Sequence, residues 1–170
     1  MKVPTFLNSI EQGGLSVWIR ESDSPFAYYF VLLMHNLGLA LIVGTSLVIG
    51  LRLLGVAPDL PLKPMKKFFT ICWIGVWVSI VSGILLLTSY PTKALTNPLF
   101  YLKLIFVAIG VWITRKIERA AFADENASDE AIVAAGRSLA VRALVVWIAA
   151  LSAGRLLAYS FKYLLYPSQG

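Results

Sequence analysis

Cysteine and histidine are almost absent from this 170-residue sequence, which contains one of each. The single cysteine, Cys72, excludes a disulfide within the chain and a cysteine-rich zinc or iron–sulfur site. The single histidine, His35, excludes a haem held by two histidines of the same chain. A metal bound at His35 therefore needs a second ligand of another type or from another protein.

Charged residues are also scarce. They make up 14% of the chain against 58% for hydrophobic residues, and the mean hydropathy is +0.76, whereas soluble domains are about a quarter charged. Four apolar runs are long enough to cross a bilayer, which needs about 20 residues per helix; they are residues 25–51, 68–90, 98–114 and 143–160. The sequence predicts an all-α integral membrane protein whose residues 25–170 form one four-helix bundle.

Residues 1–24 precede the first span and lack the continuous apolar stretch of a signal peptide, so we expect them to be retained. Apolar residues recur at helical spacing on both sides of Gly13 and Gly14. This pattern predicts one or two short amphipathic helical turns on the outer membrane surface. A loosely ordered arm anchored by Trp18 is the alternative.

Positive charges gather at the ends of the predicted spans. The loops after the first and third spans and their flanks hold Arg52, Lys63, Lys66, Lys67, Arg115, Lys116, Arg119, Arg137 and Arg142. By the positive-inside rule these loops face the cytoplasm. The sequence thus predicts a multi-pass protein of the bacterial inner membrane with both termini on the periplasmic side. Because topology accounts for the net charge of +6, we expect no nucleic-acid partner.

Helix signals mark two of the predicted starts. Asn97 followed by Pro98 is a capped start with proline at the first helical position. Ser128, Asp129 and Glu130 provide a cap and acidic residues, so we expect the fourth helix to begin there and to run through Arg142 into the membrane. Small residues recur every four positions within two spans, which predicts close helix packing; they are Gly75, Ser79 and Gly83, Ala40 and Gly44, and Ser46 and Gly50.

Three ionisable side chains lie inside the predicted spans: His35, Lys103 and Arg155. All three fall in the outer half of the bundle, and no Asp or Glu occurs in any span to pair with the two cations. A b-type haem suits this set, because imidazole can bind iron while Lys103 and Arg155 meet the propionates. Gly38, one turn after His35, and Gly83 on the second span would leave room for a flat macrocycle.

The second axial ligand stays open among Lys103, Met34 and a partner protein. Met34 is the poorest candidate because adjacent helix positions point about 100° apart. An interpretation without a cofactor is also open. In it, Lys103 and Arg155 extend to lipid headgroups, and His35 forms a hydrogen bond with a neighbouring helix.

Two stretches, MHNLGLALIVGTSLVIGLRLLG and VSGILLLTSYPTKALTNPLFYLKLIFV, resemble an uncharacterised family of bacterial four-helix inner-membrane proteins. The matching features are His35, the LRLLG motif of residues 51–55, Gly83, Asn97, Pro98, Phe100 and Lys103. More distantly, the placement of His35 and Lys103 is similar to that in membrane-bound protoporphyrinogen oxidases and copper-resistance D-type membrane proteins. This resemblance implies that His35 is an axial haem ligand and Lys103 its partner.

The leading hypothesis from the sequence is a small inner-membrane redox protein that binds b-type haem or associates with a quinone. In this hypothesis His35 is the metal ligand, and Lys103 and Arg155 hold anionic groups. The alternative is a non-catalytic accessory subunit of a larger membrane complex, and transport of copper or a small solute ranks third. The expected partners are the lipid bilayer and either other membrane subunits or further copies of the chain.

Overall fold

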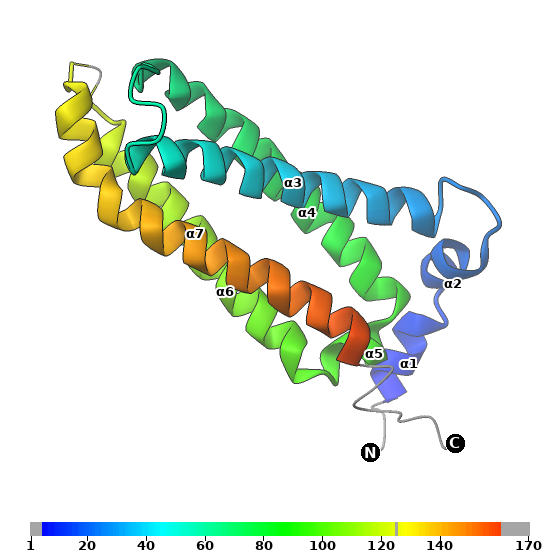
Figure 1. The fold of residues 1–170 in the computed structure, drawn as a ribbon. Coiled ribbons are helices and arrows are strands. Elements are labelled where there is room, and N and C mark those ends of the chain that lie inside the picture. Colours follow the sequence, from blue (N-terminus) through cyan, green and yellow to red (C-terminus); the bar gives the residue numbers. More distant parts are fainter. Residues whose placement is uncertain (1–4, 125, 161–170) are drawn as a thin grey trace.

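The computed structural model describes residues 5–124 and 126–160, and this part of the chain contains seven α-helices and no strand (Figure 1). The segments predicted at 1–24 and 25–170 extend beyond the described residues at 1–4 and at 161–170. In chain order the helices are α1 (Thr5–Glu11), α2 (Gly14–Glu21), α3 (Tyr28–Leu53), α4 (Lys66–Ser89), α5 (Pro91–Leu95), α6 (Pro98–Ala121) and α7 (Asp129–Ser160). A short 3-10 helix at Lys63–Met65 precedes α4.

Four of these helices, α3, α4, α6 and α7, are long and apolar enough to cross a bilayer, which confirms the predicted all-α membrane bundle. Both predicted helix starts are correct. Asn97 accepts a hydrogen bond from the Leu99 backbone N–H at 3.0 Å, and α7 begins at Asp129 directly after Ser128. The sequence reading did not identify α5, a single short turn that begins at Pro91.

The four long helices form two antiparallel hairpins, α3–α4 and α6–α7 (Figure 1). In the first hairpin, Gly38 lies directly against α4. A Cβ added to Gly38 would lie 2.8 Å from the backbone nitrogen of Ser79 and 2.9 Å from the carbonyl oxygen of Gly75. In the second hairpin, Gly110 of α6 accommodates the buried indole ring of Trp147 in the same way, with the ring 2.9 Å from its added Cβ. Glycine thus sets the closest approach within each hairpin.

The two hairpins meet at the end of the molecule that carries the α3–α4 and α6–α7 connections, here named the loop end. Gly50 of α3 contacts Leu144 of α7 there. Positions 148, 151 and 155 lie on the face of α7 that contacts α3 at Leu144. Farther along this face the side chains are no longer covered, since Ile148 is 65% and Leu151 44% exposed. The hairpins therefore separate toward the opposite end, here named the terminal end, where α3 and α6 begin and α4 and α7 finish (Figure 1).

The LRLLG motif builds the connection at the loop end. Gly55, with a φ of 97°, ends α3 in the left-handed conformation, and the backbone N–H of Val56 returns to the carbonyl of Leu51. The side chain of Arg52 is buried: its Nε donates to the carbonyl of Leu60 at 2.6 Å, and its guanidinium also reaches the carbonyl of Pro58 and the carboxylate of Asp129. Arg52 thus joins α3, the following loop and the start of α7.

The N-terminal helices α1 and α2 flank Gly13, as the sequence predicts; α2 docks on the end of α4 and α1 docks on α5. Ser16 donates to the carbonyl of Thr88 at 2.7 Å, and Thr92 donates to Glu11 at 2.7 Å. Ile19 is buried on the same side. The outward side carries large apolar residues, including Leu15 and Trp18, in the manner of a helix in the membrane interface.

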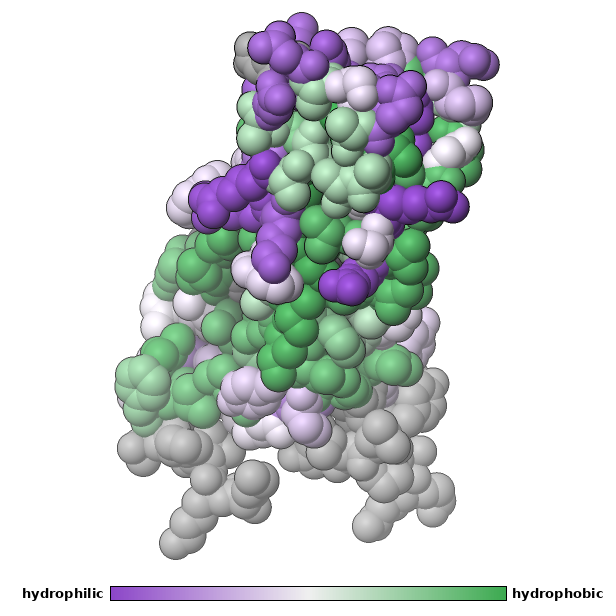
Figure 2. Space-filling model, turned by 90° about the vertical axis from the view of Figure 1, so that its left-hand side faces the viewer, coloured by the Kyte–Doolittle hydropathy of each residue, from purple (hydrophilic) through white to green (hydrophobic). Residues whose placement is uncertain are grey.

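The surface of the bundle is divided into a hydrophilic part and a hydrophobic part along its length. Figure 2 shows hydrophilic side chains gathered at the loop end and a hydrophobic surface below it. Large apolar side chains such as Ile74, Trp77, Val145 and Ile148 are more than half exposed, which a membrane protein allows because lipid covers them. The chain is therefore a multi-pass membrane protein.

The close crossing at Gly38 predicts that Gly38→Ala destabilises the bundle by about 1–3 kcal/mol, because the added methyl group collides with the backbone of α4. Gly44→Ala is the matched control on the same helix, since a Cβ at Gly44 has no atom within 4 Å; it should be neutral or stabilise by less than about 1 kcal/mol. Thermal unfolding in detergent measures both. Equal effects of the two substitutions would contradict this role of the crossing.

Replacing Arg52 should loosen the loop end. Arg52→Gln removes the donors for two carbonyls and for Asp129, so we expect a loss of about 2–4 kcal/mol and faster proteolysis between residues 55 and 62. Arg137→Gln makes the same change of charge at an exposed position and should alter stability by less than about 0.5 kcal/mol. Wild-type proteolysis of the Arg52 variant would argue against this role of the side chain.

Candidate functional site

His35 lies about 10 Å along α3 from its start at Tyr28, and its ring is held by α4. Nδ1 lies 3.2 Å from the hydroxyl oxygen of Ser82, and that hydroxyl donates to the carbonyl of Val78 at 2.6 Å. A hydroxyl has only one proton to donate, so Ser82 accepts the hydrogen bond from Nδ1–H. The lone pair of the imidazole is therefore on Nε2.

Lys103 of α6 is the neighbour of that lone pair. Its Nζ lies 3.5 Å from Nε2 of His35, the outer limit of a hydrogen bond, and its side chain is half-buried. The other side of Lys103 faces α7, where a Cβ added to Gly154 would lie 3.5 Å from Cε. Side chains and backbone of all four long helices thus meet around this pair.

The two glycines predicted to make room at His35 are placed differently. Gly83 lies beside the imidazole, where an added Cβ would be 3.3 Å from its Cε1 atom. The space beside Gly38 is filled by Gly75 and Ser79 of α4, so the room expected there for a macrocycle is taken by helix packing. Of the two, only Gly83 lies next to the His35 ring.

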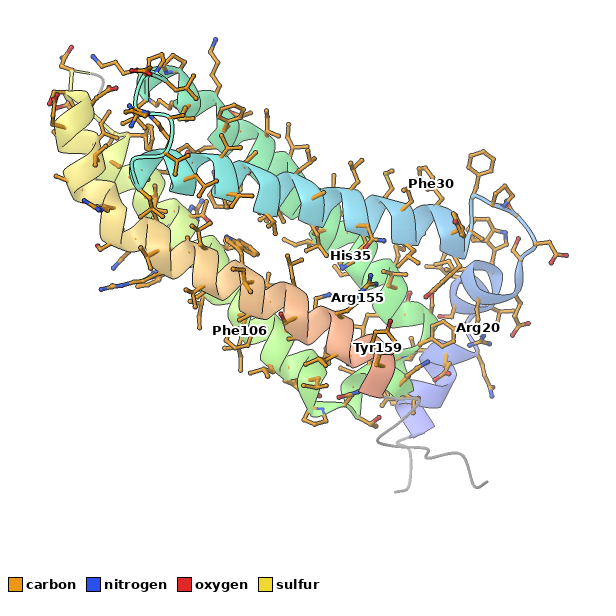
Figure 3. The ribbon with its side chains drawn as sticks, viewed as in Figure 1. Arg20, Phe30, His35, Phe106, Arg155 and Tyr159 are labelled. Atoms are coloured by element: carbon orange, nitrogen blue, oxygen red, sulfur yellow. The ribbon has the colours of Figure 1, made fainter. Side chains whose placement is uncertain are left out.

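Arg155, the third ionisable residue of the predicted site, is exposed on α7. Figure 3 shows it on the side of α7 that faces α3, the side on which His35 lies. Among the described residues it has no hydrogen-bond or ion-pair partner. Arg155 therefore brings an uncompensated positive charge to the region where the hairpins separate.

The sequence predicts that His35, Lys103 and Arg155 lie in the same half of the bundle, and the structure brings His35 and Lys103 into contact. The interpretation without a cofactor predicts a hydrogen bond from His35 to a neighbouring helix, and Ser82 of α4, beside Gly83, forms it. Sequence reasoning did not identify Ser82 as that partner. The position of Ser82 next to Gly83, a predicted site residue, was the only sequence signal for its role. That signal was not enough, because a serine in a membrane helix usually bonds to its own backbone and the sequence does not give the register between α3 and α4.

The donor set restricts what the pair can bind. In the described part of the chain, no three His, Cys, Asp or Glu side chains are grouped to hold a metal ion. One imidazole lone pair and one amine are too few to bind a metal through protein ligands alone. They are suited to a metal that brings its own equatorial ligands, as iron in haem does, or to an organic group with a carbonyl.

No family model, curated protein or solved structure matches the chain significantly. The resemblance to bacterial inner-membrane proteins therefore stays a prediction from the sequence.

Because His35 is the only histidine in the chain, ¹⁵N-histidine labelling reports a single ring. We expect the wild-type spectrum to show a protonated Nδ1 and an unprotonated Nε2. Ser82→Ala removes the acceptor for Nδ1–H and should shift the ring toward the opposite tautomer. Thr88→Ala, which removes another hydroxyl of α4 that bonds to its own helix backbone, should leave the spectrum unchanged. A wild-type ring protonated only at Nε2 would contradict the assignment.

Proposed function

We propose that this protein is a small membrane redox protein that binds a b-type haem between its two hairpins. His35 would hold the iron through Nε2, and Lys103 is the candidate for a second protein ligand. The observation that carries the proposal is the pairing of an unprotonated imidazole nitrogen with a lysine amine at 3.5 Å, contributed by different hairpins. We further propose the bacterial inner membrane as its location, with the loop end in the cytoplasm.

The surroundings of His35 support a ligand role. Metal-binding histidines almost always donate their second ring N–H to an oxygen, which fixes the ring and leaves the other nitrogen for the metal. Ser82 fulfils this condition for Nδ1. The ring also rests on Gly83, so its orientation is fixed by both a hydrogen bond and packing.

The positive charges support an anionic cofactor. A cation within a membrane span is costly unless it is paired or lies near the interface, and the spans contain no acidic residue near the terminal end that could pair with Arg155 or Lys103. Haem propionates would supply that charge. The guanidinium of Arg155 would hold them, and a protonated Lys103 that is not an iron ligand would do the same. A bound haem would give the protein one-electron chemistry.

A quinone is the second candidate, and the same contact favours it. Lys103 can donate a hydrogen bond to a quinone carbonyl, and Nε2 of His35 can accept a proton from the corresponding quinol hydroxyl. This arrangement uses Lys103 as a donor and requires no metal. It predicts a colourless protein that binds added quinone.

A reduced-minus-oxidised absorbance spectrum of the purified full-length protein tests the haem proposal. We expect an alpha band and about one haem per chain. His35→Ala should abolish it, and Ser82→Ala should weaken haem affinity about 10–100-fold. Asn36→Ala, next to His35 but exposed, is the matched control and should retain the full band.

Lys103→Ala separates the two roles of the lysine. If Lys103 is the second axial ligand, the variant keeps haem but converts from a low-spin to a high-spin spectrum. If Lys103 pairs with a propionate, the spin state is unchanged and the midpoint potential shifts, as it should in Arg155→Gln. A colourless wild-type protein that co-purifies with other membrane subunits would overturn the haem proposal and favour the accessory role.

A further inference from the structure

A second polar cluster occupies the membrane-facing side of the molecule toward the loop end. There a groove of about 520 Å³ opens between α4 and α6, the two helices that lie behind α3 and α7 in Figure 1. Trp73 of α4 bridges the groove by donating from its indole nitrogen to Glu118 of α6 at 3.1 Å. The groove exists because α4 and α6 belong to different hairpins and pack little against each other.

The groove is strongly positive. Lys66, Arg115 and Arg119 line it, and Glu118 is the one carboxylate among its lining residues. The guanidinium of Arg115 lies over the ring of Trp73, 5.0 Å from the centroid. Within the described residues neither Arg115 nor Arg119 has a carboxylate at ion-pair distance. Their guanidinium groups are thus available to a phosphate, which arginine binds in bidentate geometry.

An apolar stripe continues the groove along α4 toward the terminal end. Trp77 lines the groove and is 67% exposed. Val81 and Ile84 follow on the same helix face and are 57% and 56% exposed. A ligand that fits both parts has an anionic head and a long hydrocarbon tail. A free phosphate or a soluble anion would use only the basic part.

We propose that this groove binds one anionic phospholipid of the surrounding membrane. Its phosphate lies between Arg115 and Arg119 with Lys66 beside it, and one acyl chain lies along Trp77, Val81 and Ile84. Basic pockets between membrane helices are suited to anionic headgroups. The bound lipid fills the space between α4 and α6 and so links the two hairpins. The proposal does not depend on haem or quinone binding at His35.

Native mass spectrometry of the full-length protein tests it with equal amounts of phosphatidylglycerol and phosphatidylcholine of the same chain length. We expect one retained phosphatidylglycerol in clear preference. Each arginine near a lipid headgroup contributes roughly fivefold to binding, so Arg115→Gln/Arg119→Gln should lower that preference about twentyfold. Arg137→Gln/Arg142→Gln, the same charge change at exposed positions of α7, should change it less than about twofold.

Quenching by phosphatidylglycerol with brominated acyl chains provides a second readout that does not require the arginine variant to fold. In nanodiscs containing a small fraction of this lipid, Trp77→Phe should remove more of the quenching than Trp112→Phe. Trp112 is the matched control because it is similarly exposed, at 57%, and lies outside the groove.

The proposal would be overturned by no preference for the anionic lipid, by the same preference in the Arg115/Arg119 variant, or by an equal loss of quenching in Trp77→Phe and Trp112→Phe. Displacement of the lipid by inorganic phosphate at millimolar concentration would also overturn it, because the site would then bind a soluble anion. Loss of haem in His35→Ala should leave lipid binding unchanged, so the two proposals can fail separately.

Discussion

The close crossing of α3 and α4 determines the geometry of the candidate site. Gly38 lies so near the backbone of Gly75 and Ser79 that any side chain larger than hydrogen would force the helices apart. Three residues before Gly38 on α3 is His35, and three residues after Ser79 on α4 is Ser82. Because the helices are antiparallel, the crossing places these two residues opposite each other, and their hydrogen bond follows from it. The tautomer of His35 thus depends on the packing of Gly38 against α4, nearly one helix turn away.

The second hairpin reaches the site because the two hairpins are joined firmly at the loop end and diverge from there. Arg52, the contact of Gly50 with Leu144, and the hydrogen bond from Trp73 to Glu118 hold them together. Near Leu144 one face of α7 packs against α3, and toward the terminal end the same face is exposed. Lys103 is long enough to cross this widening space to His35. A flexible side chain thus makes the contact where backbone packing has ended.

Composition and periodicity predicted the class of fold, the four membrane helices and the starts of α6 and α7, because those depend on local apolar length and capping. They also placed His35, Lys103 and Arg155 in the same half of the bundle, and the structure brings the first two into contact. They did not predict Ser82 as the partner of His35, or that Gly38 packs against α4 and not beside a cofactor, since both depend on the register between helices. Arg52 was interpreted only as a topology signal, whereas its burial follows from a loop that folds back over it. Gly44 was expected in a packing face, but a Cβ added there would have no atom of a neighbouring helix within 4 Å.

The contrast among the cations within the long helices supports the argument for a ligand at the site. Arg52 shows how this chain stabilises a buried positive charge when it does so alone: two carbonyls and a carboxylate surround the guanidinium. Lys103 has a single long contact with an imidazole nitrogen, and Arg155 has no polar partner in the described part of the chain. A membrane offers few substitutes for such partners. Lys103 and Arg155 at the terminal end thus have fewer polar partners than Arg52 has at the loop end, and the anionic cofactor that we propose would provide carboxylates for both.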